Sequence, residues 1–151
     1  MKIEVIVPML NEYECIDEFI SRIKKVKSEL IKDSVDLDLL IVDDGSDVKF
    51  KTILSNINKT AKFVKIITLT RNFGHQAAIR AGIDNSKSDA VVTIDGDLQD
   101  PPELILEMVD LWKKGADHVS TIRSERKSET FIKKITASIY YYILDNSSNF
   151  K

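Results

Sequence analysis

The stretch that decides the fold of this chain is VVTIDGDLQDPPE, residues 91–103. Its first half is rich in β-branched residues, which suit a buried strand, and its second half turns at a glycine and two prolines. Asp95, Asp97 and Gln99 therefore follow a strand directly, where open α/β sheets bind their ligands. Mg²⁺ and Mn²⁺ prefer such oxygen ligands, so the stretch predicts a metal-bridged phosphate site. The alternative is a simple turn, which Asp, Gly and Pro also favour.

Strand-like and helix-like segments alternate through the whole sequence. Short apolar runs predict strands at residues 3–7, 37–42, 63–69, 90–94 and 118–122. Apolar residues at three- and four-residue spacing, or good helix formers, predict helices at 16–30, 48–58, 76–84, 101–112 and 131–144. This alternation predicts an α/β fold, a mostly parallel sheet with helices on both faces, in a single domain spanning residues 1–151.

Composition excludes several classes of protein. The net charge of −2 argues against a general nucleic-acid binder, which would be strongly basic. A single cysteine, Cys15, cannot form an internal disulfide and is expected to be a small buried hydrophobe. The sequence has no run of 18 apolar residues that could span a membrane, so a cytoplasmic domain is expected.

Polar clusters follow four of the predicted strands. They are Asn11 with Glu12, Asp43 with Asp44, Arg71 with Asn72, and Asp95 with Asp97. The carboxyl ends of parallel strands lie on one edge of a sheet, so these clusters should meet there, which favours a site over four unrelated turns. The glycine patterns of dinucleotide-binding folds and of P-loops are missing from the sequence, so phosphate would be held in another way.

Four motifs in this order and spacing carry a family resemblance. They are VPMLNE at 7–12, VDDGS at 42–46, RNFGHQAA at 71–78 and DGDLQDPPE at 95–103. Together they resemble glycosyltransferase family 2, of GT-A fold, and within it the polyprenyl-phosphate branch of dolichol-phosphate mannose synthases and bactoprenol glucosyltransferases. The resemblance covers essentially the whole chain and implies the Rossmann-like architecture of a nucleotide-diphospho-sugar transferase.

The resemblance also implies roles for individual residues. Those expected to bind the nucleotide sugar are Pro8, Asn11, Glu12, Asp43, Asp44, Arg71, Gly74, His75 and Asp95, with Asp44, beside Asp43, touching the base or ribose. Asp95, Asp97 and Gln99 would hold Mg²⁺ or Mn²⁺. Arg123 and Arg126 would face the phosphates and act with Asp95 and Asp97 in catalysis. For His75, a polar contact to phosphate and a structural role remain equally open.

The function implied by the resemblance is metal-dependent transfer of a sugar, with inversion, from a UDP- or GDP-sugar to a polyprenyl phosphate (bactoprenol or dolichol phosphate). A metal would neutralise the leaving diphosphate. The acceptor phosphate is already anionic near neutral pH and needs less help from a base than a hydroxyl would.

Members of this branch usually continue past residue 151 with an acceptor segment, and many add transmembrane helices. Contact with a membrane surface, at its cytoplasmic face, is therefore expected only through a full-length form, and the oligomeric state is left open. Two alternatives are a non-catalytic nucleotide-sugar-binding fragment and, ranked lower, a metal-dependent phosphohydrolase with Asp95 as nucleophile.

Overall fold

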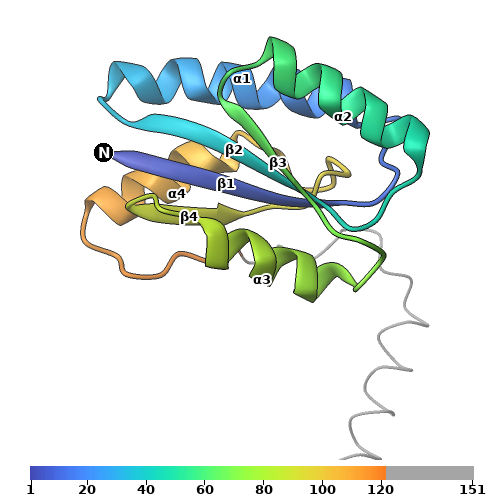
Figure 1. Ribbon diagram of the computed structural model, residues 1–151. Coiled ribbons are helices and arrows are strands. Elements are labelled where there is room, and N and C mark those ends of the chain that lie inside the picture. The colour runs from blue at the N-terminus through green and yellow to red at the C-terminus, as the bar shows by residue number, and fades with distance from the viewer. Residues whose placement is uncertain (122–151) are drawn as a thin grey trace, which may run out of the picture. The chain divides into compact units, whose positions relative to one another are not determined.

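A computed structural model describes residues 1–121, and its elements all lie within Met1–His118. Strands and helices alternate as predicted (Figure 1). The elements are β1 (Lys2–Met9), α1 (Ile16–Lys32), β2 (Asp36–Asp43), α2 (Val48–Thr60), β3 (Val64–Thr68), α3 (His75–Asn85), β4 (Ala90–Thr93) and α4 (Leu104–Lys113). The described sheet has the strand order β3-β2-β1-β4, and each neighbouring pair is parallel. The predicted fold class is confirmed.

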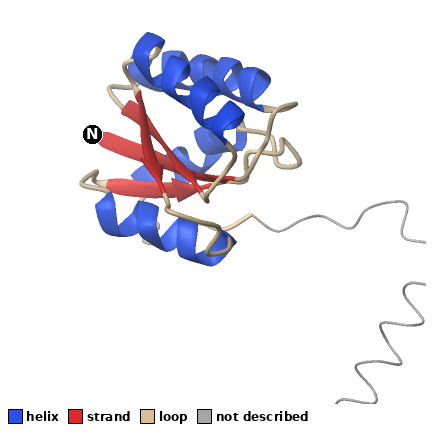
Figure 2. Cartoon of the chain, turned by 45° about the vertical axis from the view of Figure 1, so that its right-hand side comes forward, coloured by secondary structure: helices blue, strands red, loops and turns tan. Residues whose placement is uncertain are grey.

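Helices cover both faces of the sheet, as Figure 2 shows. One face of β1 and β2 packs against α1, α2 and α4, and the buried residues from these helices are Ile16, Phe19, Ile23, Val26, Leu30, Phe50, Leu54, Ile105 and Val109. On the other face, Ile6, Leu40 and Val42 pack against Ala78 of α3. Strands covered on both faces are apolar at successive positions, which explains the continuous apolar runs of the sequence.

Helix α3 lies close to the sheet because it carries a glycine where it crosses β1 and β2. A Cβ atom at Gly82 would lie 2.4 Å from Cγ2 of Ile6 and 3.2 Å from Cγ2 of Val42. A side chain at this position would push α3 away from the sheet. The close approach also sets the position of the first turn of α3, which reaches the edge of the sheet where the strands end.

Strand β1 continues through Pro8 to Met9, beyond the strand predicted at residues 3–7. Backbone groups of a strand face its two neighbours alternately. The Ile6 carbonyl accepts from Ile94 on the β4 side, and the Met9 carbonyl accepts from Asp44 on the β2 side. Pro8 therefore faces the β4 side, where pairing has already ended at Thr93. Its missing N–H removes no bond of the sheet.

The prediction of a strand at 118–122 is wrong for residues 118–121, which the structure describes and which are not in a strand. Only Val119 among these four has a large apolar side chain, so a strand there would bury little. Residue 122 and the predicted helix at 131–144 lie outside the described residues. Within residues 1–121, no helix is both long and apolar enough to cross a membrane.

Candidate functional site

The structure brings the four predicted polar clusters to one edge of the sheet. The loops that carry them follow β1, β2, β3 and β4, and all four strands run in the same direction. We call this edge the rim and define it by residues 10–15, 44–47, 69–75 and 94–103. The predicted residues Pro8 and Asp43 lie at the ends of β1 and β2, directly beneath it.

The β4 loop presents two carboxylates at the rim. The side chain of Asp95 is 47% exposed, and its Oδ1 atom lies 3.4 Å from Nε2 of His75. Asp97 accepts a hydrogen bond from the backbone N–H of the exposed Gln99 at 3.0 Å, which closes a tight turn. Between the two aspartates, Gly96 is buried against the side chains of β1 and anchors the loop to the sheet.

Glu12, from the β1 loop, shares the electrostatic environment of these two aspartates. Partial burial raises the pKa of Glu12 above its ordinary value, and the charges of Asp97 and Asp95 raise it further. Burial also raises the pKa of the Cys15 thiol, which is partly buried and lies 3.7 Å from the backbone carbonyl of Asp97. Three carboxylates therefore concentrate negative charge on this side of the rim, a setting that favours a bound cation.

Asp43, the last residue of β2, and Asp44, which follows it, are buried more deeply than the two aspartates that follow β4. Asp43 is 0% exposed; its Oδ1 accepts from the backbone N–H of Ser46 at 2.8 Å, and its Oδ2 has no hydrogen-bond partner within residues 1–121. Asp44 is 4% exposed, and its two oxygens accept from the backbone N–H groups of Phe73 at 2.8 Å and Gly74 at 2.9 Å.

The β2 and β3 loops are pressed together at Gly45. This glycine has φ = +81°, and a Cβ atom there would lie 2.3 Å from the carbonyl carbon of Arg71. Arg71 in turn places its guanidinium group 4.8 Å from the ring centre of Phe73, which is half exposed. Gly74 then ends the loop, and His75 is the first residue of α3.

The four loops contact one another in a closed ring. Its contacts are Asn11 N–H to Ser46 Oγ at 3.0 Å, Asp44 to the backbone of Phe73 and Gly74, His75 to Asp95, and Cys15 Sγ to the carbonyl of Asp97. Asn11 has φ = +57°, and its side-chain oxygen accepts a further hydrogen bond from the backbone of Asp47 at 3.0 Å. The first loop is thus held to both the second and the fourth.

Sequence reasoning missed three residues of this ring. Ser46, Asp47 and Cys15 connect loops but were not selected as site residues. Asp47 could have been found, because it is the residue before a helix and its side chain caps α2 by accepting from Phe50 N–H at 2.9 Å. The predicted site residues Arg123 and Arg126 lie outside the described part of the chain.

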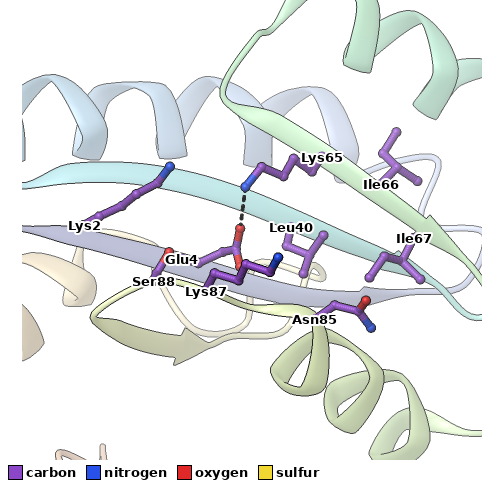
Figure 3. A pocket seen from close by; sticks show the side chains of 9 residues that line it. All are labelled: Lys2, Glu4, Leu40, Lys65, Ile66, Ile67, Asn85, Lys87 and Ser88. Carbon is purple, nitrogen blue, oxygen red and sulfur yellow. Dashed lines mark hydrogen bonds and ion pairs between the residues drawn. The ribbon is translucent and has the colours of Figure 1, made fainter.

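A pocket of about 290 Å³ lies elsewhere, over the amino-terminal half of the sheet beside the end of α3 (Figure 3). Its floor includes the buried Glu4, which accepts a hydrogen bond from Lys65 at 3.0 Å, and Lys2 and Lys87 stand around it. The positive charges of Lys2 and Lys65 are balanced by carboxylates, since Asp38 forms ion pairs with both lysines and Glu4 pairs with Lys65. This pocket includes none of the rim residues, so the candidate site rests on the rim.

The sequence model described as "Glycosyl transferase family 2" matches residues 4–150. The chain belongs to glycosyltransferase family 2. This membership confirms the resemblance drawn from the four motifs and decides against the phosphohydrolase alternative.

Curated members of the family resemble the chain along almost its full length. The uncharacterized glycosyltransferase YkcC of Bacillus subtilis (strain 168) is 44% identical over 145 residues, which cover 96% of this chain and 44% of that protein. A prophage bactoprenol glucosyl transferase homolog of Escherichia coli (strain K12) is 35% identical over 149 residues, covering 99% and 48%. The chain therefore spans less than half the length of these relatives.

A solved structure supports the fold. The mannosyltransferase PcManGT from Pyrobaculum calidifontis, in complex with GDP-Man and Mn²⁺, superimposes with a TM-score of 0.63 at 20% identity, covering 81% of this chain and 35% of that one. The architecture of residues 1–121 is therefore that of a GT-A glycosyltransferase, as the motifs implied.

The donor atoms of this family 2 chain fit an open metal site. Within residues 1–121, no group of three or more His, Cys, Asp or Glu side chains is arranged to enclose an ion. Asp95 and Asp97 nevertheless provide two partly exposed carboxylates, and the exposed Gln99 follows them in the same loop. Mg²⁺ is typically held by one or two carboxylates, with water and substrate phosphates completing its coordination. The rim therefore suits a metal that arrives with a phosphate ligand.

Proposed function

We propose that the chain is the donor-binding part of a metal-dependent, inverting glycosyltransferase that moves a sugar from a UDP- or GDP-sugar to a polyprenyl phosphate. The observation that carries the proposal is the placement of the accessible carboxylates Asp95 and Asp97 beside Glu12 and His75 at the carboxyl edge of the sheet. The names of the bactoprenol glucosyl transferase relatives support the acceptor class, and the neighbour bound to GDP-Man and Mn²⁺ supports the donor class.

Asp95 and Asp97, with Gln99, would hold Mg²⁺ or Mn²⁺. When bound, the ion supplies positive charge that neutralises the leaving nucleoside diphosphate. Without a cation, the negative charges of the three neighbouring carboxylates would repel a diphosphate. Burial, and then the charges of Asp97 and Asp95, already raise the pKa of Glu12. The backbone N–H groups at the start of α3 favour an anion. His75 lies there, 3.4 Å from Asp95, where its ring can donate to a phosphate oxygen.

The reaction we propose is a direct displacement. An oxygen of the acceptor phosphate forms a bond to the anomeric carbon as the bond from that carbon to the donor phosphate oxygen breaks, and the nucleoside diphosphate leaves with the electron pair. An acceptor phosphate is largely dianionic above pH ~6, so no proton has to be removed from it. The role of the chain is then to bind, orient and neutralise rather than to act as a base.

The base and ribose are expected to lie between the β1 and β2 loops, near Asn11 and Asp43. Asp43, directly beneath the rim, keeps one buried carboxylate oxygen without a partner in residues 1–121. Arg71, at the rim, and Arg123 and Arg126 would face phosphates. Recognition of the lipid acceptor, at the cytoplasmic face of a membrane, would involve a longer form of the protein.

Calorimetric titration with UDP and GDP, each with and without Mn²⁺, tests the donor site. We expect one nucleotide to bind in a metal-dependent manner, and Asp97→Asn to abolish the metal dependence. The matched control is Asp110→Asn, which removes the same charge from an exposed position on α4. Failure of both nucleotides to bind at millimolar concentration would contradict the proposal.

A second candidate is a nucleotide-sugar-binding protein that does not turn over alone. The observation that favours it is the short span of the chain relative to its relatives, 44% of one and 48% of another. A transfer assay with radiolabelled donor and polyprenyl phosphate, on this chain and on a longer one, separates the two. Turnover by the 151-residue chain itself would exclude the second candidate.

A further inference from the structure

The carboxylate of Asp44 is fully occupied by the backbone of another loop. It is 4% exposed, and each of its oxygens accepts a backbone N–H, one from Phe73 at 2.8 Å and one from Gly74 at 2.9 Å. Hydrogen bonds to an ionised acceptor are stronger than those between neutral groups. A buried carboxylate with both oxygens engaged in this way holds the polypeptide chain rather than presenting a surface to a ligand.

The contact between these two loops extends beyond the carboxylate. Gly45, the next residue, lies so close to the β3 loop that a Cβ atom would be 2.3 Å from the carbonyl carbon of Arg71 and 2.5 Å from the backbone nitrogen of Asn72. The side chain of Asn72 adds a second acceptor for Gly74 N–H at 2.9 Å. The conformation of the β3 loop is therefore set by the β2 loop and by its own asparagine.

The β3 loop leads directly into the candidate site. Gly74 is the cap residue of α3, and its N–H is donated to Asp44. A carboxylate at this end of a helix also has a favourable interaction with the helix dipole. His75, the next residue, is the one whose ring lies 3.4 Å from Asp95. The position of the His75 ring relative to the candidate metal ligand thus depends on where Asp44 holds the loop.

We propose that Asp44 is a positioning residue, which fixes the β3 loop so that His75 stands beside Asp95, and that it does not contact the base or ribose. The inference rests on the proposed function for the role of His75 and Asp95 in donor binding. It separates the roles of two adjacent aspartates, because the side chain of Asp43 bonds within its own turn to Ser46, and Asp43 contacts the β3 loop only through its backbone carbonyl, which accepts from Leu69 N–H at 2.9 Å.

Hydrogen exchange measured by NMR on the 151-residue chain without ligand tests the placement, with Asp44→Asn compared against Asp43→Asn. An asparagine can accept from only one of the two N–H groups, so Asp44→Asn should speed exchange at Phe73 or Gly74 by about tenfold or more. The ring resonances of His75 should shift as they do in Asp95→Asn. Asp43→Asn should leave exchange at Phe73 and Gly74 within about twofold of the parent.

Titration of the same variants with UDP and GDP in the presence of Mn²⁺ tests the second part of the proposal, that Asp44 does not contact the base or ribose. Asp44→Asn should weaken both nucleotides by a similar factor and leave the ratio of their affinities unchanged, because the base is not touched. Unchanged exchange at Phe73 and Gly74 would overturn the proposal, as would a changed affinity ratio. If the parent chain binds neither nucleotide while the exchange difference persists, the placement stands and the proposed function fails.

Discussion

Two pairs of aspartates follow strands of the same parallel sheet, and the structure treats them differently. Asp43 and Asp44, at the end of β2, are 0% and 4% exposed, whereas the side chain of Asp95, after β4, is 47% exposed. The buried pair bonds to backbone N–H groups of its own loop and of the β3 loop. The pair after β4, which we call the exposed pair, is half exposed at Asp95 and partly buried at Asp97, and it contacts a histidine and its own turn. Similar residues thus form a scaffold in one loop and a candidate ligand site in another.

The position of each strand in the sheet explains the difference. Strand β2 lies between β1 and β3, so the loop at its end is flanked by loops on both sides. Strand β4 is at one edge of the described sheet and pairs only with β1, so the loop after it is flanked by a neighbouring strand end on one side. A carboxylate at an interior strand therefore meets backbone donors, while one at the edge strand stays accessible to a ligand.

The largest effect is expected from Gly45→Ala, which disrupts the tight contact between the β2 and β3 loops beside the buried pair, Asp43 and Asp44. The new Cβ would lie 2.3 Å from the carbonyl carbon of Arg71, and the alanine would have to adopt φ = +81°. We therefore expect the unfolding free energy, measured in urea, to fall by about 3 kcal/mol. Gly115→Ala is the matched control, because it has φ = +98° without a described atom near its Cβ, and should cost about 1 kcal/mol. Equal losses would show that the loops are not in tight contact.

The next largest effect is expected at the exposed pair, Asp95 and Asp97, and it is on the affinity for the nucleotide. Asp97→Asn should lower the affinity for the Mn²⁺-bound nucleotide by about 100-fold, because one of two carboxylate ligands becomes neutral. Its unfolding free energy should stay within about 0.5 kcal/mol of the parent. Calorimetry and urea unfolding on the same preparation measure the two quantities. A variant that loses stability instead of affinity would assign this aspartate to the scaffold.

A smaller effect on stability separates the two pairs directly. Asp44→Asn replaces one oxygen that accepts a backbone N–H of the β3 loop by an NH₂ group that cannot accept, in a buried position, and should cost about 2 kcal/mol. Asp95→Asn, which removes the same charge from a half-exposed position, should change the unfolding free energy by less than about 0.5 kcal/mol. The two variants differ from the parent by the same chemical change, so urea midpoints compare them fairly. Equal midpoints would show that Asp44 and Asp95 contribute alike to the stability of the fold.

The smallest effect is on how the unfolding free energy depends on pH. It involves Glu12, whose pKa depends on burial and on the charges of Asp97 and Asp95. The pKa of Glu12 is raised above its ordinary value of 4.5 by burial and by Asp97 and Asp95, so the folded state holds this proton more tightly than the unfolded state. Ionisation of Glu12 therefore costs stability as the pH rises from 4.5 through the folded value, and the cost persists at neutral pH.

Glu12→Gln should consequently stabilise the fold at pH 7 by no more than about 0.5 kcal/mol, and should have no such effect near pH ~3, where both states are protonated. Unfolding in urea at the two pH values measures this. Glu14→Gln, an exposed change in the same loop, is the control for removing a charge without the burial and the neighbouring aspartates. A stabilisation that is equal at both pH values would contradict the assignment.

Much of the fold follows from local patterns in the sequence. The apolar spacing at residues 16–30 predicted α1, whose buried residues recur at intervals of three and four, and the helix predicted at 101–112 corresponds to α4. The continuation of β1 through Pro8 could not be predicted, because it depends on where the neighbouring strand stops pairing. The placement of the four loops on one edge of the sheet could be predicted, because each loop follows a strand and all the strands run in the same direction.

The division of labour among the acidic residues could not be predicted from the sequence. Asp44 bonds to N–H groups 29 and 30 residues away, and no local pattern encodes such a partner. The exposure of Asp95 depends on its strand being at an edge of the described sheet, which is a property of topology. Resemblance assigned nucleotide contacts to both kinds of aspartate alike, and only the burial of their side chains separates them.

The closed ring of loop contacts has a consequence for the thermodynamics and kinetics of binding. Loops that are ordered only by a ligand lose conformational entropy during association and slow it. Here the ordering of the β1, β2, β3 and β4 loops is completed when the chain folds, since each is held by its neighbours. Donor association is then expected to occur in a single kinetic phase, with differences in affinity among nucleotides residing mainly in their dissociation rates.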